Sequence, residues 1–333
     1  MSDSDGLEPA PESTLEEGKI FDYITGEPVK DTDKERVRQR IARAIIHEYG
    51  IAAEDMTPDY RVKVNGKQRK IDIALFHPGT THDLENLYRV VVVEKEPKFG
   101  AKGAYRMRDP EEARKEFDLL EAVMAEVESC QYGLWTNGLE FFFFKKEVTR
   151  FDTRFKPIGD WPVGDDTIGT REAASLARMR RADPVMLRTA FRRCHNYIHG
   201  NEGMPKDAAF WQFLYLIFCK MHDERRLGEQ RDFWAGPYEP FTPEGQKAIR
   251  KRIEPLFDAV KNAYPALFKG NEAITLSDRA LAFIVSELSR YDFARTDVDA
   301  KGAAYQEIVG ANLRGDRGQY FTPRGAIRLV IQI

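Results

Sequence analysis

The stretch YRVKVNGKQRKIDIALFHPGTTHDLENLYRVVVVEKE, residues 60–96, decides the fold of the first half of the chain. Residues 60–64 and 68–76 are rich in β-forming side chains, and the Asn-Gly pair between them is a strong signal for a two-residue hairpin turn. Residues 87–94 are nearly continuous valine, which is typical of an interior strand covered on both faces. Asp72 interrupts the apolar pattern of the second strand, and a carboxylate there needs a specific reason.

The flanking sequence completes an α/β unit. Thr32 and Glu35 form a capping-box pattern at the start of a helix that we expect to end at Gly50. This order of elements predicts one α/β domain over residues 19–150. The other expected elements are a helix over residues 109–127 and strands over residues 131–136 and 139–144. Arg36, Arg38, Arg40 and Arg43 of the first helix are expected to form a solvated surface, with a phosphate contact as the alternative.

The run Tyr132-Gly133-Leu134-Trp135-Thr136-Asn137-Gly138, together with Asp72 and Glu94, resembles the N-terminal domain of type I restriction endonuclease subunits. The resemblance implies a PD-(D/E)XK nuclease fold in which Asp72 and Glu94 bind a divalent ion such as Mg²⁺. In that family a lysine two positions after the glutamate assists the attacking water, whereas this chain has Glu96 there. Two alternatives stay open: a nuclease with Glu96 as a third metal ligand, and a nuclease-shaped scaffold reused to bind DNA or a partner.

The second half of the chain has helical periodicity. Residues 151–170 are expected to be an irregular linker, and residues 171–300 a helical domain whose segment 207–226 is apolar almost all round and therefore buried. His195 and His199 have a zinc-compatible spacing, but no second pair is evident, so core or capping histidines are the favoured interpretation. A dense basic run is either a solvated helix face or a DNA-phosphate contact. It consists of Arg178, Arg180, Arg181, Arg188, Arg192 and Arg193.

The last stretch, Gly315-Asp316-Arg317-Gly318-Gln319-Tyr320-Phe321-Thr322-Pro323-Arg324, combines a loop with a helix start. Thr322 can cap a helix whose first turn accommodates Pro323, and the N-terminus of such a helix attracts anions. Tyr320 and Phe321 could line an apolar wall beside it. The alternative is a loop that caps an ordinary helix.

This segment resembles the start of the catalytic domain of DNA adenine methyltransferases of the type I restriction–modification class. The resemblance implies that residues 301–333 begin a Rossmann-like domain and that Tyr320, Phe321, Thr322 and Pro323 line an S-adenosylmethionine pocket. Residues 213–224 are similar to the central helix of that family's helical N-terminal domain. The family's glycine-rich strand–turn and Asn-Pro-Pro-aromatic motif do not occur in the 333 residues, so this chain alone is expected to transfer no methyl group.

The composition of the chain limits its possible partners and its location. The net charge is −3, so any contact with duplex DNA must come from local basic patches. Three widely spaced cysteines, an acidic tail over residues 1–18 and no apolar run of membrane-spanning length suggest a cytoplasmic protein with a disordered start. We therefore interpret the chain as the front part of a DNA adenine methyltransferase that works with a specificity or nuclease subunit. A Mg²⁺-dependent endonuclease and a non-catalytic binding module are the alternatives.

Overall fold

The computed structural model describes residues 16–98, 105–162, 179–228 and 230–296, with Gly302 and Gln306. Several expectations fall outside the described residues. They concern most of the acidic tail, Arg178, and the segment with Tyr320, Phe321, Thr322 and Pro323.

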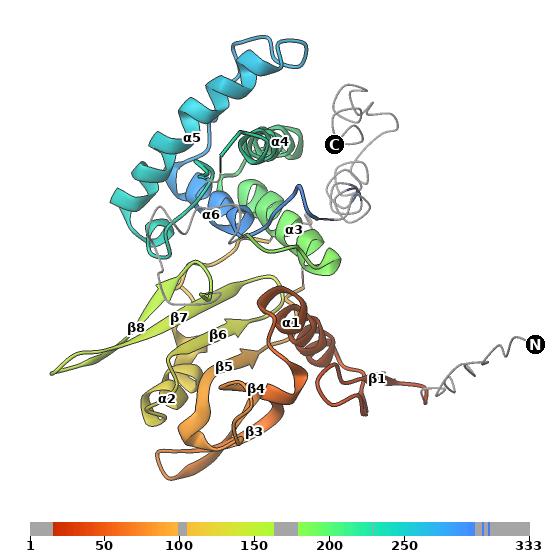
Figure 1. Cartoon of the computed structure of the whole chain (residues 1–333), viewed down its shortest axis with the longest axis vertical. Coiled ribbons are helices and arrows are strands. Elements are labelled where there is room, and N and C mark those ends of the chain that lie inside the picture. Colours follow the sequence, from red (N-terminus) through yellow and green to blue (C-terminus); the bar gives the residue numbers. More distant parts are fainter. Residues whose placement is uncertain are drawn as a thin grey trace, which may run out of the picture.

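A six-stranded sheet forms the base of the molecule (Figure 1), in the order β3-β4-β5-β6-β7-β8. Neighbouring strands are antiparallel except for the parallel pair β5 and β6. A separate two-stranded sheet, β1 (Lys19–Phe21) and β2 (Pro28–Lys30), precedes it. The strands of the main sheet are β3 (Met56–Val64), β4 (Lys67–Phe76), β5 (Leu87–Val93), β6 (Tyr132–Thr136), β7 (Phe141–Val148) and β8 (Thr153–Ile158).

Each face of the sheet is covered by one helix. Helix α1 (Asp33–Tyr49) packs Val37, Ile41 and Ile45 on one face, and α2 (Asp118–Glu126) packs on the other. Because alternate valines of β5 enter different cores, the strand is apolar throughout, as its sequence predicts.

Local signals at the ends of α1 and at the first hairpin are confirmed. The Thr32 hydroxyl accepts a hydrogen bond from the Glu35 amide at 3.1 Å, and Gly50 ends the helix at φ 67°. Glu35 does not close the capping box, since its carboxylate accepts bonds from Arg38 and Gln39 instead. At the tip between β3 and β4, Asn65 and Gly66 have φ angles of 49° and 76°, as a two-residue hairpin turn requires.

Two expected segments differ from the structure. The helix expected from residue 109 starts only at Asp118, after a short 3₁₀ turn, although Asp109 and Glu112 bond each other's backbone amides as in a capping box. Residues 151–170, expected to be an irregular linker, contain strand β8. Pro157 and the charged residues of β8 weaken the strand signal in the sequence. Proline is tolerated here because β8 is an edge strand of the sheet.

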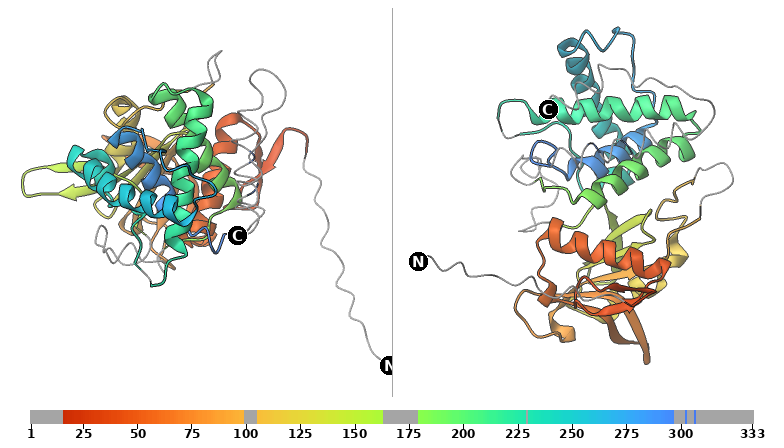
Figure 2. Two further views of the ribbon diagram at one scale, coloured as in Figure 1. Left: turned by 90° about the horizontal axis from the view of Figure 1, so that it is seen from above. Right: turned by 90° about the vertical axis from the view of Figure 1, so that its right-hand side faces the viewer.

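Four described helices form the second unit, beside β7 and β8 (Figures 1 and 2). Their N-caps include Asp183, Thr242 and Ser277, each accepting a bond from a backbone amide of the first turn. Helix α4 is largely buried, as expected, and no helix among the described residues is long and apolar enough to cross a membrane. The helices are α3 (Pro184–Asn201), α4 (Lys206–Glu224), α5 (Pro243–Ala263) and α6 (Asp278–Ser289).

The two units contact each other through polar groups as well as apolar ones. Arg43 of α1 forms an ion pair of 2.8 Å with Asp183, the N-cap of α3. The Gly159 amide, just after β8, donates to the Pro237 carbonyl at 2.8 Å. Residues of both units can therefore meet in one site.

Candidate nucleic-acid interface

One edge of the sheet gathers the carboxylates expected from the sequence. The carboxyl ends of β5 and β6 lie side by side, since Val93 is in register with Thr136. Asp72 of β4 lies at the same edge, where its Oδ2 accepts a bond from the Val93 amide at 2.8 Å. The structure thus brings Asp72 next to the segment that begins at Glu94.

These carboxylates are engaged by cations from other elements. Lys34 Nζ, at the start of α1, lies 2.9 Å from Asp72 Oδ1. Glu96 pairs with Arg40 at 3.2 Å and with Arg192 at 2.8 Å, while Glu94 is exposed. Across the described residues, no group of three or more His, Cys, Asp or Glu side chains could hold a metal ion. The third carboxylate of the expected metal set therefore faces two arginines.

The pair of histidines with zinc-compatible spacing, and the cysteine Cys219 of α4, also have other surroundings. His199 Nδ1 is 2.7 Å from the Met204 carbonyl, and Cys219 is fully buried in the core of the helical unit. The favoured interpretation, that these side chains cap and fill the core, agrees with these contacts.

An arginine pocket lies between α1 and α3, which we define by Arg40, Arg188 and Arg192. It is a cavity of about 190 Å³, completed by Val185 and Thr189. Arg188 and Arg192 are one helical turn apart on α3, so both point to the same side. Two of the three guanidinium groups, those of Arg40 and Arg192, pair with one carboxylate, Glu96, so the site keeps an excess of positive charge.

The buried parts of this pocket lack acceptors. The Nη2 of Arg40 donates to the Gly138 carbonyl at 2.9 Å, but the Nε groups of Arg40 and Arg192 are buried and have no acceptor among the described residues. Burial lowers the pKa of Arg40, against the opposing effect of Glu96. Since buried donors are normally hydrogen-bonded, the pocket is suited to an acceptor-rich anion.

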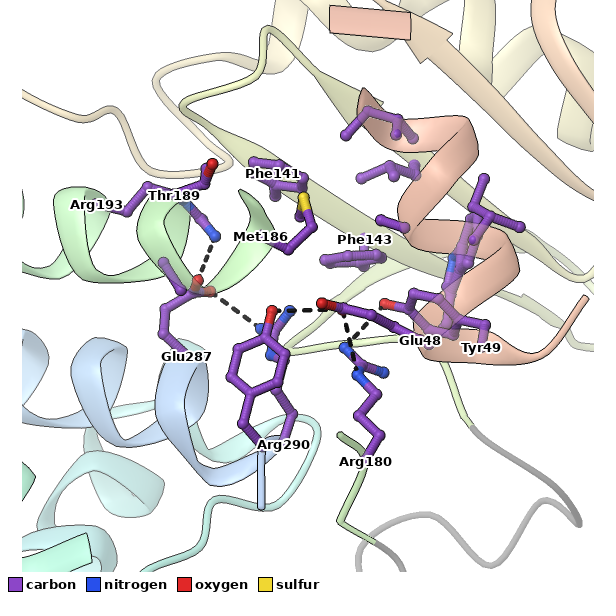
Figure 3. Close-up of a pocket in the computed structure, with 17 residues that line it drawn as sticks. Glu48, Tyr49, Phe141, Phe143, Arg180, Met186, Thr189, Arg193, Glu287 and Arg290 are labelled. Carbon is purple, nitrogen blue, oxygen red and sulfur yellow. Dashed lines mark hydrogen bonds and ion pairs between the residues drawn. The ribbon is translucent and has the colours of Figure 1, made fainter. Parts of the chain in front are cut away.

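Two members of the expected DNA-binding run lie elsewhere (Figure 3). Arg180 is buried and pairs with Asp160 at 2.8 Å and with Glu48 at 3.5 Å. Arg193 is buried against Glu287 and lies over the Phe141 ring at 4.4 Å. The expectation that these two arginines face DNA is therefore corrected: they join the helical unit to the sheet.

The helical period of α3 explains the division of the basic run. Arg193 follows Arg192 by 100° around the helix and faces the core, whereas Arg188 is exposed. Arg181 is also exposed but lies before α3 and does not line the arginine pocket. Arg40 is one of the first-helix arginines expected at the surface, with a phosphate contact as the alternative. Its partners Gly138 and Glu96 are distant in the chain, so no local pattern links it to α3.

Figure 3 shows the junction between α1 and the helical unit, which contains a buried carboxylate, Glu48, with a shifted pKa. Burial raises the pKa of Glu48 to about 7, against the opposing effect of Arg180. The Asp183 amide and the Tyr291 hydroxyl also donate to Glu48, at 3.1 and 3.4 Å. Asp160 is half-buried, and Arg180 and Arg290 hold its pKa below the usual value against the effect of burial. The junction is thus sensitive to pH chiefly through Glu48.

The geometry can now be set beside known proteins. Residues 33–162 match the family model of the type I restriction enzyme R protein N terminus. The match begins at α1 and continues through β8, so it covers Asp72, Glu94, Glu96 and Arg40. It supports a role related to restriction–modification for this part of the chain. A search of curated proteins finds no match.

Proposed function

We propose that this chain is a DNA-binding component of a restriction–modification system and that it holds a backbone phosphate in the arginine pocket. The observation that carries the proposal is the convergence of Arg40, Arg188 and Arg192 around one cavity. A guanidinium group can donate two parallel hydrogen bonds to the oxygens of one phosphate, and it stays charged at every physiological pH. The family match supplies the context of a multi-subunit complex that acts on duplex DNA.

The salt dependence of duplex binding tests this proposal. Each phosphate contact that is lost lowers the slope of log K against log salt by about 1. We expect this change for Arg188→Ala, because Arg188 is exposed and forms no ion pair among the described residues. Arg154→Ala is the control, since Arg154 of β8 is also exposed and pairs only with Asp152 there. An unchanged slope for Arg188→Ala would show that this face is merely solvated.

A methyltransferase role is a further proposal, supported by residues 315–324 alone. In it, Tyr320, Phe321, Thr322 and Pro323 contact S-adenosylmethionine, and the enzyme methylates the exocyclic amine of adenine. The present chain would supply one wall of that pocket, so we expect its affinity for the cofactor to be no tighter than millimolar, about −4 kcal/mol. A micromolar isotherm in calorimetry would contradict the expectation that these residues form only one wall of the pocket.

A Mg²⁺-dependent nuclease is the second candidate, favoured by the position of Asp72 beside Glu94. In that role Lys34 must leave Asp72 before a metal can bind, because their ion pair occupies one carboxylate oxygen. Plasmid nicking in Mg²⁺ that disappears in Asp72→Ala would support it, whereas nicking that persists would exclude Asp72 as the ligand.

A further inference from the structure

The hairpin of β3 and β4 extends beyond the rest of the sheet. Strand β4 pairs with β3 from Lys67 to Leu75, but it pairs with β5 only from Ile73 to Phe76. Residues 67–72 and their partners on β3 therefore form a two-stranded ribbon without a third strand. The tight turn at Asn65 and Gly66 keeps its tip narrow.

This ribbon is strongly basic in a chain of net charge −3. Asp59 is the acidic partner that it offers, pairing with Lys70 at 3.0 Å. The register places Arg61 opposite Lys70 on one face, which is exposed. The other face carries Val62 and Val64, which are buried in the core, so the first face is the positively charged one. Its exposed cations are Arg61, Lys63, Lys67, Arg69 and Lys70.

The ribbon and the arginine pocket lie at the same edge of the sheet. Antiparallel pairing puts the start of β4 beside the carboxyl end of β5, and parallel pairing puts the end of β6 there too. Gly138, which follows β6, accepts the bond from Arg40 in the pocket. One ligand that runs along this edge can therefore contact both.

We propose that the β3–β4 ribbon enters a groove of the same DNA duplex whose phosphate occupies the arginine pocket. The second part of this statement depends on the proposed function; the ribbon contact stands on its own charge and shape. A two-stranded β-ribbon fits the width of the major groove, and the exposed lysines and arginines of this ribbon would neutralise phosphates of the groove walls. The ribbon thus extends the contact beyond a single phosphate.

A different role must be separated from this one. Strand β3 is an edge of the sheet, and lysines on edge strands prevent pairing with a second copy of a protein. That role needs charge on β3, whereas three of the five cations belong to β4. The experiment below therefore measures self-association as well as DNA binding.

The test neutralises three cations at the tip, in the triple variant Lys63→Gln, Lys67→Gln and Arg69→Gln. The matched control neutralises three cations of the β7–β8 hairpin, which projects from the opposite edge because β7 runs antiparallel to β6 (Figure 1). Fluorescence anisotropy with a 20-base-pair duplex in EDTA gives affinity against salt, and sedimentation gives the oligomeric state. The control variant is Arg150→Gln, Arg154→Gln and Lys156→Gln.

We expect the tip variant to lose at least about tenfold in affinity and about 2 in salt slope, and the control to lose much less. Equal losses in both variants would overturn the inference, since the effect would then be one of net charge. Unchanged binding with new self-association would overturn it in favour of edge protection. If Arg188→Ala loses binding and the tip variant does not, the ribbon contact is rejected and the proposed function stands. If the tip variant loses binding and Arg188→Ala does not, the phosphate site in the arginine pocket is rejected and the ribbon contact stands.

Discussion

Glu96, which the resemblance seen in the sequence places where a nuclease lysine is expected, is held by two arginines. Its carboxylate accepts bonds from Arg40 and Arg192 at 3.2 and 2.8 Å, as a bound phosphate would. Asp72 lies beside Val93 at the end of β5, because β4 pairs with β5. The partners of Glu96 are 56 and 96 residues away and come from helices, so no local pattern reveals them.

At this scale we predict that Glu96→Gln binds duplex DNA more tightly than the native chain. The native carboxylate competes with phosphate for the two guanidinium groups, and a partly exposed pair of this kind is worth about 1 kcal/mol, or roughly fivefold in affinity. Glu94→Gln is the control, since it removes the same charge two residues away without touching the arginine pocket. Anisotropy in EDTA compares the two, and an equal gain in both would contradict competition by Glu96.

Elements whose limits depend on local chemistry were predicted well. The N-cap Thr32 and the Asn65-Gly66 turn occur where the sequence indicates, because each depends only on neighbouring residues of the chain. Strand β8 and the turn before α2 were not predicted, because both depend on distant parts of the chain. Arg108, for example, is fixed by Glu140 at 2.7 Å, and this contact anchors the turn that replaces the expected helix start.

The junction between α1 and the helical unit makes stability depend on pH. The folded pKa of Glu48 is about 7 and its ordinary value is 4.5, so between these values the folded state binds more protons than the unfolded state. The contribution of Glu48 is therefore complete below pH 4.5 and is lost as the pH rises through 7, with a limiting slope of about 1.4 kcal/mol per pH unit.

Urea unfolding between pH 5 and pH 8 measures this effect. We predict that the free energy of unfolding of Glu48→Gln falls less over this range than that of the native chain. Burial lowers the pKa of His222, which acts in the opposite direction, but it does so in both proteins and cancels from the comparison. Parallel pH profiles would show that Glu48 ionises normally at the junction.

On the scale of the whole molecule, the arginine pocket exists only because the two units are docked. Arg40 comes from the sheet unit, and Arg188 and Arg192 come from the helical unit. The pairs Arg43–Asp183 and Arg180–Asp160 hold these units together. The sequence predicts an α/β unit followed by helices, but no local pattern predicts how the two units pack together. The pocket forms at their interface, so the sequence does not predict it.

The most direct test of phosphate binding in the arginine pocket is site-directed crosslinking. The native cysteines Cys130, Cys194 and Cys219 are buried, so a cysteine introduced in Arg188→Cys supplies an accessible thiol. A duplex with a thiol tethered to one backbone phosphate forms a disulfide with a nearby cysteine. We predict rapid crosslinking in Arg188→Cys and only background in Arg154→Cys, which is exposed at the far edge of the sheet. Equal crosslinking at both positions would contradict a phosphate site in the arginine pocket.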